Sequence, residues 1–311
     1  MSVAQQEIER IAKKSNGIVG VYARHLESDQ ILTHNAEEPF PMASTYKIGM
    51  AIKLLQHVEK GDFSLDQMIE LTPEDLSPGS GMLTPHLPHP GLALSIYNLL
   101  ETMMTLSDNT ATDKILTLID GPQAVTEWLH SIGIKGMRID RPTKSILCDA
   151  FGIPRPEGKW SLQTFQDQVK KSTEEAHQTA ARTFIADPQD TSTPSAMVSL
   201  LTQLHRNELL CEENTALLID VMKRCQTGED RINGLLPPKT IVAHKTGSIR
   251  RVAINDAGFI ITPNTGPIAL AIFTKSAKDK DFIKVIDCEQ TAAHVARTVY
   301  DYFLFSQKTQ G

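Results

Sequence analysis

A serine and a lysine three residues apart are the first residues in this chain that could do covalent chemistry. Ser44 and Lys47 lie in the stretch Pro41-Met-Ala-Ser-Thr-Tyr-Lys-Ile-Gly-Met50, which continues as an apolar run. Three residues is close to one helical turn, so the two side chains share a face if a helix begins at the serine. A desolvated lysine amine can take the serine proton, and the serine N–H at a helix N-terminus could stabilise an oxyanion.

Two further short motifs follow this pair along the chain. They are Ser107-Asp108-Asn109 and Lys245-Thr246-Gly247. By itself, Ser-x-x-Lys is common by chance, and it then indicates a serine N-cap followed by an exposed lysine. In the order Ser-x-x-Lys, Ser-Asp-Asn and Lys-Thr-Gly, the three motifs are the signature of the penicillin-recognising serine enzymes. The combination therefore favours the catalytic interpretation.

The elements that must position these motifs change type along the chain. Apolar periodicity predicts an α+β fold, a five-stranded antiparallel sheet flanked by N- and C-terminal helices, with an inserted all-α domain. We assign 1–43 and 206–311 to the sheet domain and 44–205, helical or irregular throughout, to the insertion. The expected strands are 18–23, 31–34, 241–247, 257–261 and 268–273, and the expected helices are 5–15, 44–60, 94–106, 111–119, 123–132, 162–181 and 282–305.

Composition limits the class of function. With 311 residues, 41% of them hydrophobic, the chain can bury a large core, and its net charge of −6 gives no reason to expect a nucleic acid partner. No apolar run is long enough to span a membrane, and the first ten residues do not show the basic and apolar regions typical of a secretory signal. We therefore expect a cytoplasmic protein, or a periplasmic or secreted one if the chain is a processed form. The four scattered cysteines indicate isolated thiols, and no metal or organic cofactor is expected.

Over nearly its whole length, from about residue 18 to residue 305, the chain resembles the class A β-lactamases. Beyond the three motifs, familiar stretches are the Asp-Gly-Pro at Asp120, the Asp-Thr-Ser-Thr-Pro-Ser-Ala-Met at Asp190 and the Thr-Gly-Glu-Asp-Arg-Ile at Thr227. The resemblance implies that Ser44 is the acylated nucleophile and Lys47 its proton acceptor. It also implies that Ser107 passes a proton to the departing lactam nitrogen.

The same resemblance assigns residues to substrate binding. Lys245 would hold Ser107 and the substrate carboxylate electrostatically, and Thr246 would help to bind that carboxylate. Asn109 would bond the substrate's side-chain amide, and the N–H of Ser248 would complete the oxyanion hole with that of Ser44.

Arg231 is a candidate for the substrate carboxylate as well. It stands in the Thr-Gly-x-x-Arg-Ile stretch where some family members carry a carboxylate-binding arginine, and a guanidinium fork suits that task. The alternative is a surface arginine paired with Glu229 or Asp230.

One segment departs from the family pattern. Class A β-lactamases hydrolyse the acyl-enzyme with a glutamate on an Ω-shaped loop, whose neck would here be an ion pair of Arg141 with Asp190. No carboxylate follows in residues 142–147, and the segment 141–190 is enlarged, with 49 positions between its ends. The charges that could fold back over Ser44 as the base, or simply be solvated, are Asp149, Glu157, Glu174 and Glu175.

Three functions stay open at this point. The first is a serine β-lactamase with an unconventional deacylating base. The second is a penicillin-binding, D,D-peptidase-like or esterase-like serine hydrolase that acts on D-Ala-D-Ala-like substrates and deacylates lactams poorly. The third is a non-catalytic binding member of the fold, which the joint presence of all three motifs disfavours. In each case we expect a monomer with a small-molecule ligand.

Overall fold

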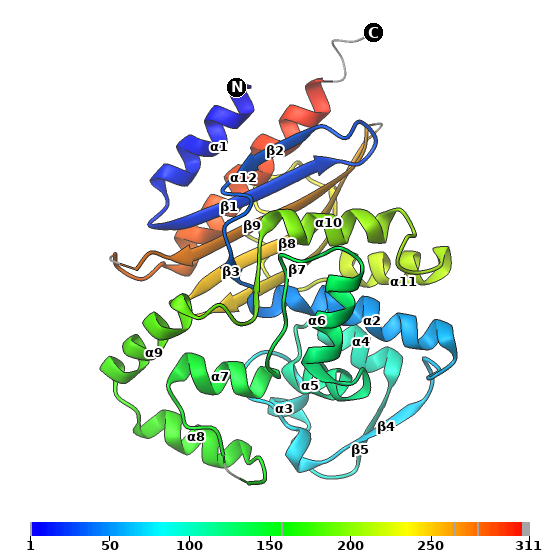
Figure 1. Ribbon diagram of the computed structural model, residues 1–311, viewed down its shortest axis with the longest axis vertical. Coiled ribbons are helices and arrows are strands. Elements are labelled where there is room, and N and C mark those ends of the chain that lie inside the picture. The colour runs from blue at the N-terminus through cyan, green and yellow to red at the C-terminus, as the bar shows by residue number, and fades with distance from the viewer. Residues whose placement is uncertain (1, 157, 264, 279, 307–311) are drawn as a thin grey trace.

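A five-stranded antiparallel sheet forms one half of the molecule (Figure 1). The computed structural model describes residues 2–156, 158–263, 265–278 and 280–306. The sheet has the order β2-β1-β9-β8-β7, so the predicted α+β class with this sheet is confirmed. Its strands are β1 (Gly17–His25), β2 (Ile31–His34), β7 (Ile241–Ile249), β8 (Ala253–Thr262) and β9 (Gly266–Ser276).

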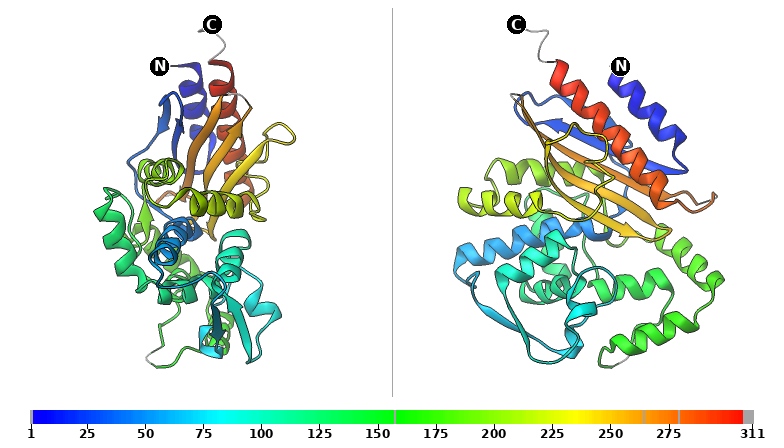
Figure 2. Two further views of the ribbon diagram at one scale, coloured as in Figure 1. Left: turned by 90° about the vertical axis from the view of Figure 1, so that its right-hand side faces the viewer. Right: turned by 180° about the vertical axis from the view of Figure 1, so that it is seen from behind.

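Both faces of the sheet are covered. Helices α1 (Val3–Lys14) and α12 (Val285–Ser306) lie side by side on one face, and α10 (Pro194–His205) lies on the other (Figures 1 and 2). On β9, Leu270 and Ile272 pack toward α1 and α12, whereas Ala271 and Phe273 belong to the core on the opposite face. A strand that is buried on both faces has apolar residues at successive positions, which explains the unbroken apolar sequence 268–273.

Helix α2 (Lys47–Lys60) is the centre of the other half. Its residues from Lys47 to Ile52, together with Leu54 and Leu55, are buried, as expected for a helix that is apolar almost all round. It ends, as predicted, at Gly61, whose φ of 80° lies in the left-handed region. The helices that contact it are α4 (Ile96–Thr105), α5 (Asn109–Leu118), α6 (Gly121–Ser131) and α11 (Glu212–Lys223).

Short strands interrupt the segment 48–205, so the prediction of a purely helical or irregular insertion is wrong. β4 (Met68–Leu71) pairs with β5 (Leu92–Ser95), and β3 (Phe40–Pro41) pairs with β6 (Thr191–Ser192). Strands of two to four residues are too short to show a period of two. Helix α4 accordingly begins at residue 96, where Ser95 accepts a hydrogen bond from the Asn98 N–H, and not at residue 94.

The predicted helix 162–181 is two helices. α8 (Leu162–Lys171) stops before Thr173, whose side chain caps α9 (Glu174–Ala186). A threonine N-cap followed by two glutamates strongly favours the start of a new helix. The chain therefore begins α9 here, although the apolar spacing continues through the break. The apolar spacing of this segment predicts that Phe165, Val169 and Ala176 point inward; Phe165 is buried, but Ala176 is exposed. The remaining elements are a 3₁₀ turn over Ala43–Tyr46, another over Pro73–Asp75, α3 (Leu83–His86) and α7 (Thr143–Phe151).

The division into domains at residue 205 stays a prediction. Helix α10 lies before that boundary in the sequence and packs on the sheet. None of the helices in the described ranges is both long and apolar enough to cross a membrane.

Candidate active site

Ser44 lies in the 3₁₀ turn that runs straight into α2. Ala43, directly before it, has a φ of 47°, a left-handed conformation that costs a non-glycine residue on the order of 1 kcal/mol. Asn255 on β8 holds this turn, because its Nδ2 donates to the carbonyls of Pro41 (2.8 Å) and Met42 (3.0 Å). The surroundings thus fix a strained backbone at the serine.

The edge strand β7 passes this turn at very close range. A Cβ added at Gly247 would lie 2.6 Å from the Met42 carbonyl oxygen and 2.9 Å from the Ser44 nitrogen, so this approach requires glycine. In the part of the chain that the structure describes, the Ser44 N–H donates to no backbone carbonyl. Ser248 follows Gly247 on the same edge strand, where alternate N–H groups point away from the sheet.

Lys47 is fully buried beside the Ser-Asp-Asn motif. Its Nζ donates to the Ser107 carbonyl oxygen (2.8 Å), to Ser107 Oγ (3.1 Å) and to Asn109 Oδ1 (2.9 Å). No hydrogen bond joins Nζ to Ser44 Oγ within the described residues. In unliganded enzymes such contacts are often loose and tighten only around the substrate. The structure thus places the Lys47 amine against Ser107, and Lys47 itself follows Ser44 by three residues.

The environment of Lys47 favours its neutral amine. Burial, and next the charge of Lys245, hold the Lys47 pKa well below its ordinary value, while Asp108 and Asp113 oppose that shift in part. A neutral amine is what a proton acceptor for Ser44 requires.

The middle residue of the Ser-Asp-Asn motif builds the loop that carries the other two. Asp108 caps α5 through the Ala111 N–H (2.9 Å), and its other oxygen accepts the N–H groups of Met82 and Leu83. Ser107 has a φ of 57°, again left-handed. Asp108 is therefore the structural residue of the motif, and it lies between Ser107 and Asn109, which are the residues assigned to function.

Asn109 is engaged at both ends of its amide. Its Nδ2 donates to the Pro78 carbonyl (2.8 Å), and its Oδ1 accepts from Lys47 and from Ser80 Oγ (3.3 Å). It is the first residue of α5, not part of the loop before that helix. A substrate amide would have to share these contacts.

Lys245 and Thr246 lie on β7 behind the Ser44 turn. Lys245 is fully buried, and its Nζ donates to the Thr246 carbonyl oxygen (2.9 Å). Burial lowers the Lys245 pKa to about 8, against the opposing charges of Cys225 and Asp256. The amine is thus a cation below that pH and loses its charge above it.

Arg231 is buried beneath the same strand. Its guanidinium donates to the carbonyls of Asn255 (2.9 Å) and Gly247 (3.3 Å) and to Ser248 Oγ (2.8 Å). It pairs with Glu289 on α12 at 3.3 Å. Arg231 therefore braces the two strands and reaches the Ser44 pocket only through Ser248.

The alternative of a surface arginine paired with Glu229 or Asp230 is wrong. Arg231 is only 5% exposed, and its ion-pair partner is Glu289. The neighbours in sequence lie in an exposed turn, and the side chain points into the sheet instead.

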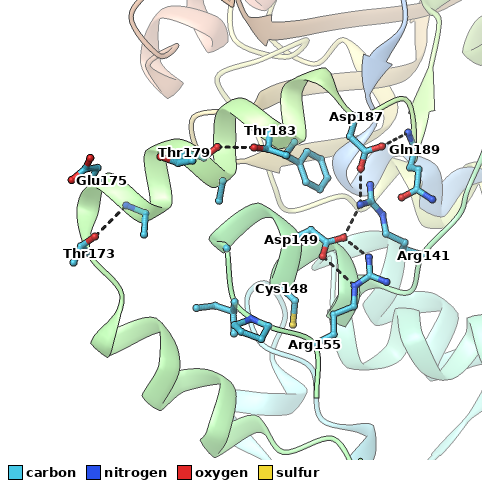
Figure 3. Close-up of a pocket in the computed structure, with 16 residues that line it drawn as sticks. Arg141, Cys148, Asp149, Arg155, Thr173, Glu175, Thr179, Thr183, Asp187 and Gln189 are labelled. Carbon is cyan, nitrogen blue, oxygen red and sulfur yellow. Dashed lines mark hydrogen bonds and ion pairs between the residues drawn. The ribbon is translucent and has the colours of Figure 1, made fainter. Parts of the chain in front are cut away.

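Arg141 and Asp190 form the predicted ion pair between the ends of the enlarged segment. Arg141 Nε lies 2.5 Å from Asp190 Oδ2, and both residues are buried. The Asp190 carboxylate also accepts the N–H groups of Asp140 and Arg141. Arg141 Nη1 bonds Asp149 (2.7 Å) and Asp187 (2.8 Å), as Figure 3 shows.

The structure does not bring the described base candidates to Ser44. Asp149 is held by Arg141 and Arg155 and lines a separate cavity between α7 and α9 (Figure 3). Glu174 begins α9, is exposed and pairs with Arg251. Glu175 lines the same α7–α9 cavity. Glu157 lies outside the described residues.

Ser44 opens into a small pocket of its own, about 200 Å³ in volume. One wall is α7, and the Tyr46 hydroxyl meets Thr143 Oγ1 there at 2.6 Å. No carboxylate is found among the described residues that line it, which are Ala43, Ser44, Tyr46, Gly79, Ser80, Asn109, Thr143, Ile146, Leu147, Phe151, Ser248, Ile249 and Arg250.

Sequence reasoning missed the residues that support this pocket from behind. Asn255 is the clearest example, since it holds the carbonyls before Ser44. Its signal was a pair of polar residues, Asn255 and Asp256, inside an otherwise apolar strand, because buried polar groups need partners. Thr227, which bonds the Thr246 hydroxyl, and Ser80 carried no comparable signal.

Comparison with known proteins identifies the family. A family model described as the β-lactamase enzyme family matches residues 3–303. Beta-lactamase VEB-1 of Pseudomonas aeruginosa is 28% identical over 307 residues, which cover 96% of this chain and 89% of that protein.

Solved structures give the same result. The crystal structure of a β-lactamase from Chitinophaga pinensis superposes with a TM-score of 0.79 at 27% identity, covering 96% of this chain and 99% of the other. The TLA-1 extended-spectrum β-lactamase has a TM-score of 0.79 at 26% identity, with 97% and 98% covered. A family match over nearly the whole chain confirms the resemblance expected from the motifs, and this chain belongs to the β-lactamase enzyme family.

Proposed function

We propose that this protein is a serine β-lactamase that opens the lactam ring by acylating Ser44 and then hydrolyses the acyl-enzyme. The observation that carries the proposal is the meeting of all three motifs at the start of α2. The Ser44 turn lies against Gly247 of β7, and Lys47 beneath it bonds Ser107 and Asn109. That the relatives are named β-lactamases supports the choice of substrate.

Acylation follows from the donors and acceptors in place. Neutral Lys47 takes the Ser44 proton, and Oγ attacks the lactam carbonyl carbon. The N–H groups of Ser44 and Ser248 stabilise the oxyanion. Ser107 Oγ, 3.1 Å from Lys47 Nζ, delivers a proton to the lactam nitrogen as the C–N bond breaks. The product is an ester on Ser44.

The substrate carboxylate belongs at the β7 end of the pocket. Lys245 supplies a positive charge there and Thr246 a hydroxyl, while Arg231 adds a second charge through Ser248 Oγ. Asn109 is assigned to the substrate's side-chain amide, sharing its contacts with Lys47 and Pro78.

Arg231→Ala is expected to raise KM for a carboxylate-bearing lactam by roughly 10-fold, the value of one charge-assisted hydrogen bond. The measurement compares the free acid with its neutral methyl ester in wild type and variant. An electrostatic role predicts that only the acid loses affinity. Equal losses for both would mean that Arg231 acts only as a brace, and unchanged kinetics would remove it from the site.

The pH dependence of binding is expected to follow Lys245. Because its pKa is about 8 and its cation binds the carboxylate, the charge is present below pH 8 and lost above it. KM for the acid should rise on the order of 10-fold between pH 7 and pH 9, while KM for the methyl ester stays flat. An acid KM that does not change over this range would contradict the role of Lys245.

Deacylation is the step with the least support from the pocket. With no carboxylate among the described lining residues, we assign the role of base for the deacylating water to the buried amine of Lys47. An amine already tied to Ser107 and Asn109 is poorly placed to orient that water. We therefore expect deacylation to be slower than acylation. The same observation favours the second candidate, a penicillin-binding type enzyme whose acyl-enzyme persists.

Stopped-flow hydrolysis of a chromogenic cephalosporin separates these functions. The proposal predicts a burst of about one equivalent per enzyme, then a slower linear phase of turnover. A burst without turnover would favour the penicillin-binding alternative, especially if a D-Ala-D-Ala peptide ester is hydrolysed. Neither burst nor turnover would overturn the proposal.

A further inference from the structure

Behind the Lys245–Thr246 strand lies a second cluster of reactive groups that the Ser44 chemistry does not use. It consists of Cys225 after α11, His244 on β7 and Asp256 on β8. His244 and Asp256 are completely buried, and Cys225 is half-buried. Together they form a thiol, an imidazole and a carboxylate in series.

Polar interactions join the three groups. His244 Nδ1 lies 2.9 Å from Asp256 Oδ1 and 3.0 Å from Oδ2. The same imidazole also interacts with the Cys225 thiol and lowers its pKa, and His244 Nε2 lies 3.5 Å from Asn233 Nδ2. The Asp256 carboxylate stabilises the protonated imidazole, and the positive charge of that imidazole favours the thiolate of Cys225. This is the general arrangement that activates a cysteine nucleophile.

The charges agree with that arrangement. Burial would raise the Cys225 pKa, but the hydrogen bond and charge of His244, together with the charge of Lys245, lower it to about 7. The His244 pKa is raised to about 10 because Asp256 outweighs the effect of burial. As the pH rises through 7, the cluster therefore becomes a thiolate–imidazolium–carboxylate series, with Arg231 as a further charge near Lys245.

The thiol is also linked to the substrate end of the pocket. Cys225 Sγ lies 3.4 Å from Thr227 Oγ1, and that hydroxyl bonds Thr246 Oγ1. The negative charges of Cys225 and Asp256 both support the cation of Lys245. A change at this sulfur thus reaches both side chains that hold the substrate carboxylate.

We propose that Cys225 is a modification site for disulfides and thiosulfonates, activated by His244 and Asp256, and that its modification weakens substrate binding. In the step, the Cys225 thiolate attacks one sulfur of the reagent, a new S–S bond forms, and the old one breaks to release a thiolate or sulfinate. The protein gains a neutral group in place of a negative charge. That group crowds Thr227 and removes support from Lys245.

The test uses the full chain and methyl methanethiosulfonate. A Cys211→Ser background removes the exposed thiol at the start of α11, and Cys148 and Cys288 are buried. The rate of modification, followed by intact mass, is expected to have its pH midpoint near 7, against about 8.5 for the cysteine of an unstructured peptide. His244→Asn should move that midpoint up by about one unit or more.

Activity is the second readout. At pH 9, modified protein should show a KM for a carboxylate-bearing lactam raised on the order of 10-fold, as expected if the Lys245 pKa falls from about 8 by about one unit. Dithiothreitol should reverse the effect, and in Cys225→Ser the same treatment should change nothing. The rate of modification should be the same in Ser44→Ala, so a failure of the proposed Ser44 chemistry leaves that readout intact. A midpoint at or above 8.5, or modified protein with an unchanged KM, would overturn the proposal.

Discussion

Replacing Ser44 with alanine is expected to lower kcat/KM for a β-lactam by on the order of 10⁴-fold or more, because no other residue can form the ester. Stopped-flow assays should show neither burst nor turnover. Within the described residues, the Ser44 side chain makes no hydrogen bond, so folding should be unaffected. The melting temperature measured by circular dichroism should therefore match that of wild type.

A surface serine provides the control for this variant. Ser131 at the end of α6 is exposed, and its Oγ bonds only the local Trp128 carbonyl. Ser131→Ala is expected to keep full activity. If Ser44→Ala retained more than a small fraction of wild-type turnover, another group would have to carry the acyl intermediate.

Lys47→Met is expected to lower the acylation rate by roughly 10²–10⁴-fold, the usual contribution of a general base. Methionine keeps the length and apolar stem but removes the amine that lies between Ser44 and Ser107. The neutral amine is the active form, so acylation in wild type rises with pH until Lys47 is deprotonated. Single-turnover rates measured across pH should show that rise in wild type, and the variant should lack it.

Another lysine of the same helix is the matched control. Lys53 is partly exposed on α2 and bonds none of the motif residues. Lys53→Met should leave the acylation rate within about twofold, as expected for a surface substitution. If both variants lose the same amount, the effect of Lys47→Met comes from damage to α2 and not from a lost base.

The parts that the sequence predicted well are those with strong local signals. The apolar run 268–273 is a strand buried on both faces, and Gly61 ends α2 with the left-handed residue that a helix end requires. The three motifs meet because α2, the start of α5 and β7 converge, which their order along the chain indicated only through the family resemblance. The resemblance itself is confirmed by the family match.

The parts that could not be predicted depend on contacts between distant residues. Arg231 forms its ion pair with Glu289 on α12, 58 positions away, although two other carboxylates lie directly before it in the sequence. Asn255 acts on the Ser44 turn across 214 positions. In the enlarged segment the carboxylates are attracted to local arginines, as Asp149 is to Arg141 and Arg155, and no sequence pattern shows which charge pairs with which.

The most direct test is intact-protein mass spectrometry after mixing the enzyme with a penicillin, sampled from milliseconds to hours. The account predicts an adduct with the full mass of the penicillin that accumulates on wild type, decays as the substrate is consumed, and is absent in Ser44→Ala. Peptide mapping should place it on Ser44. Turnover of the penicillin without any adduct on Ser44, or an adduct that persists in Ser44→Ala, would contradict it.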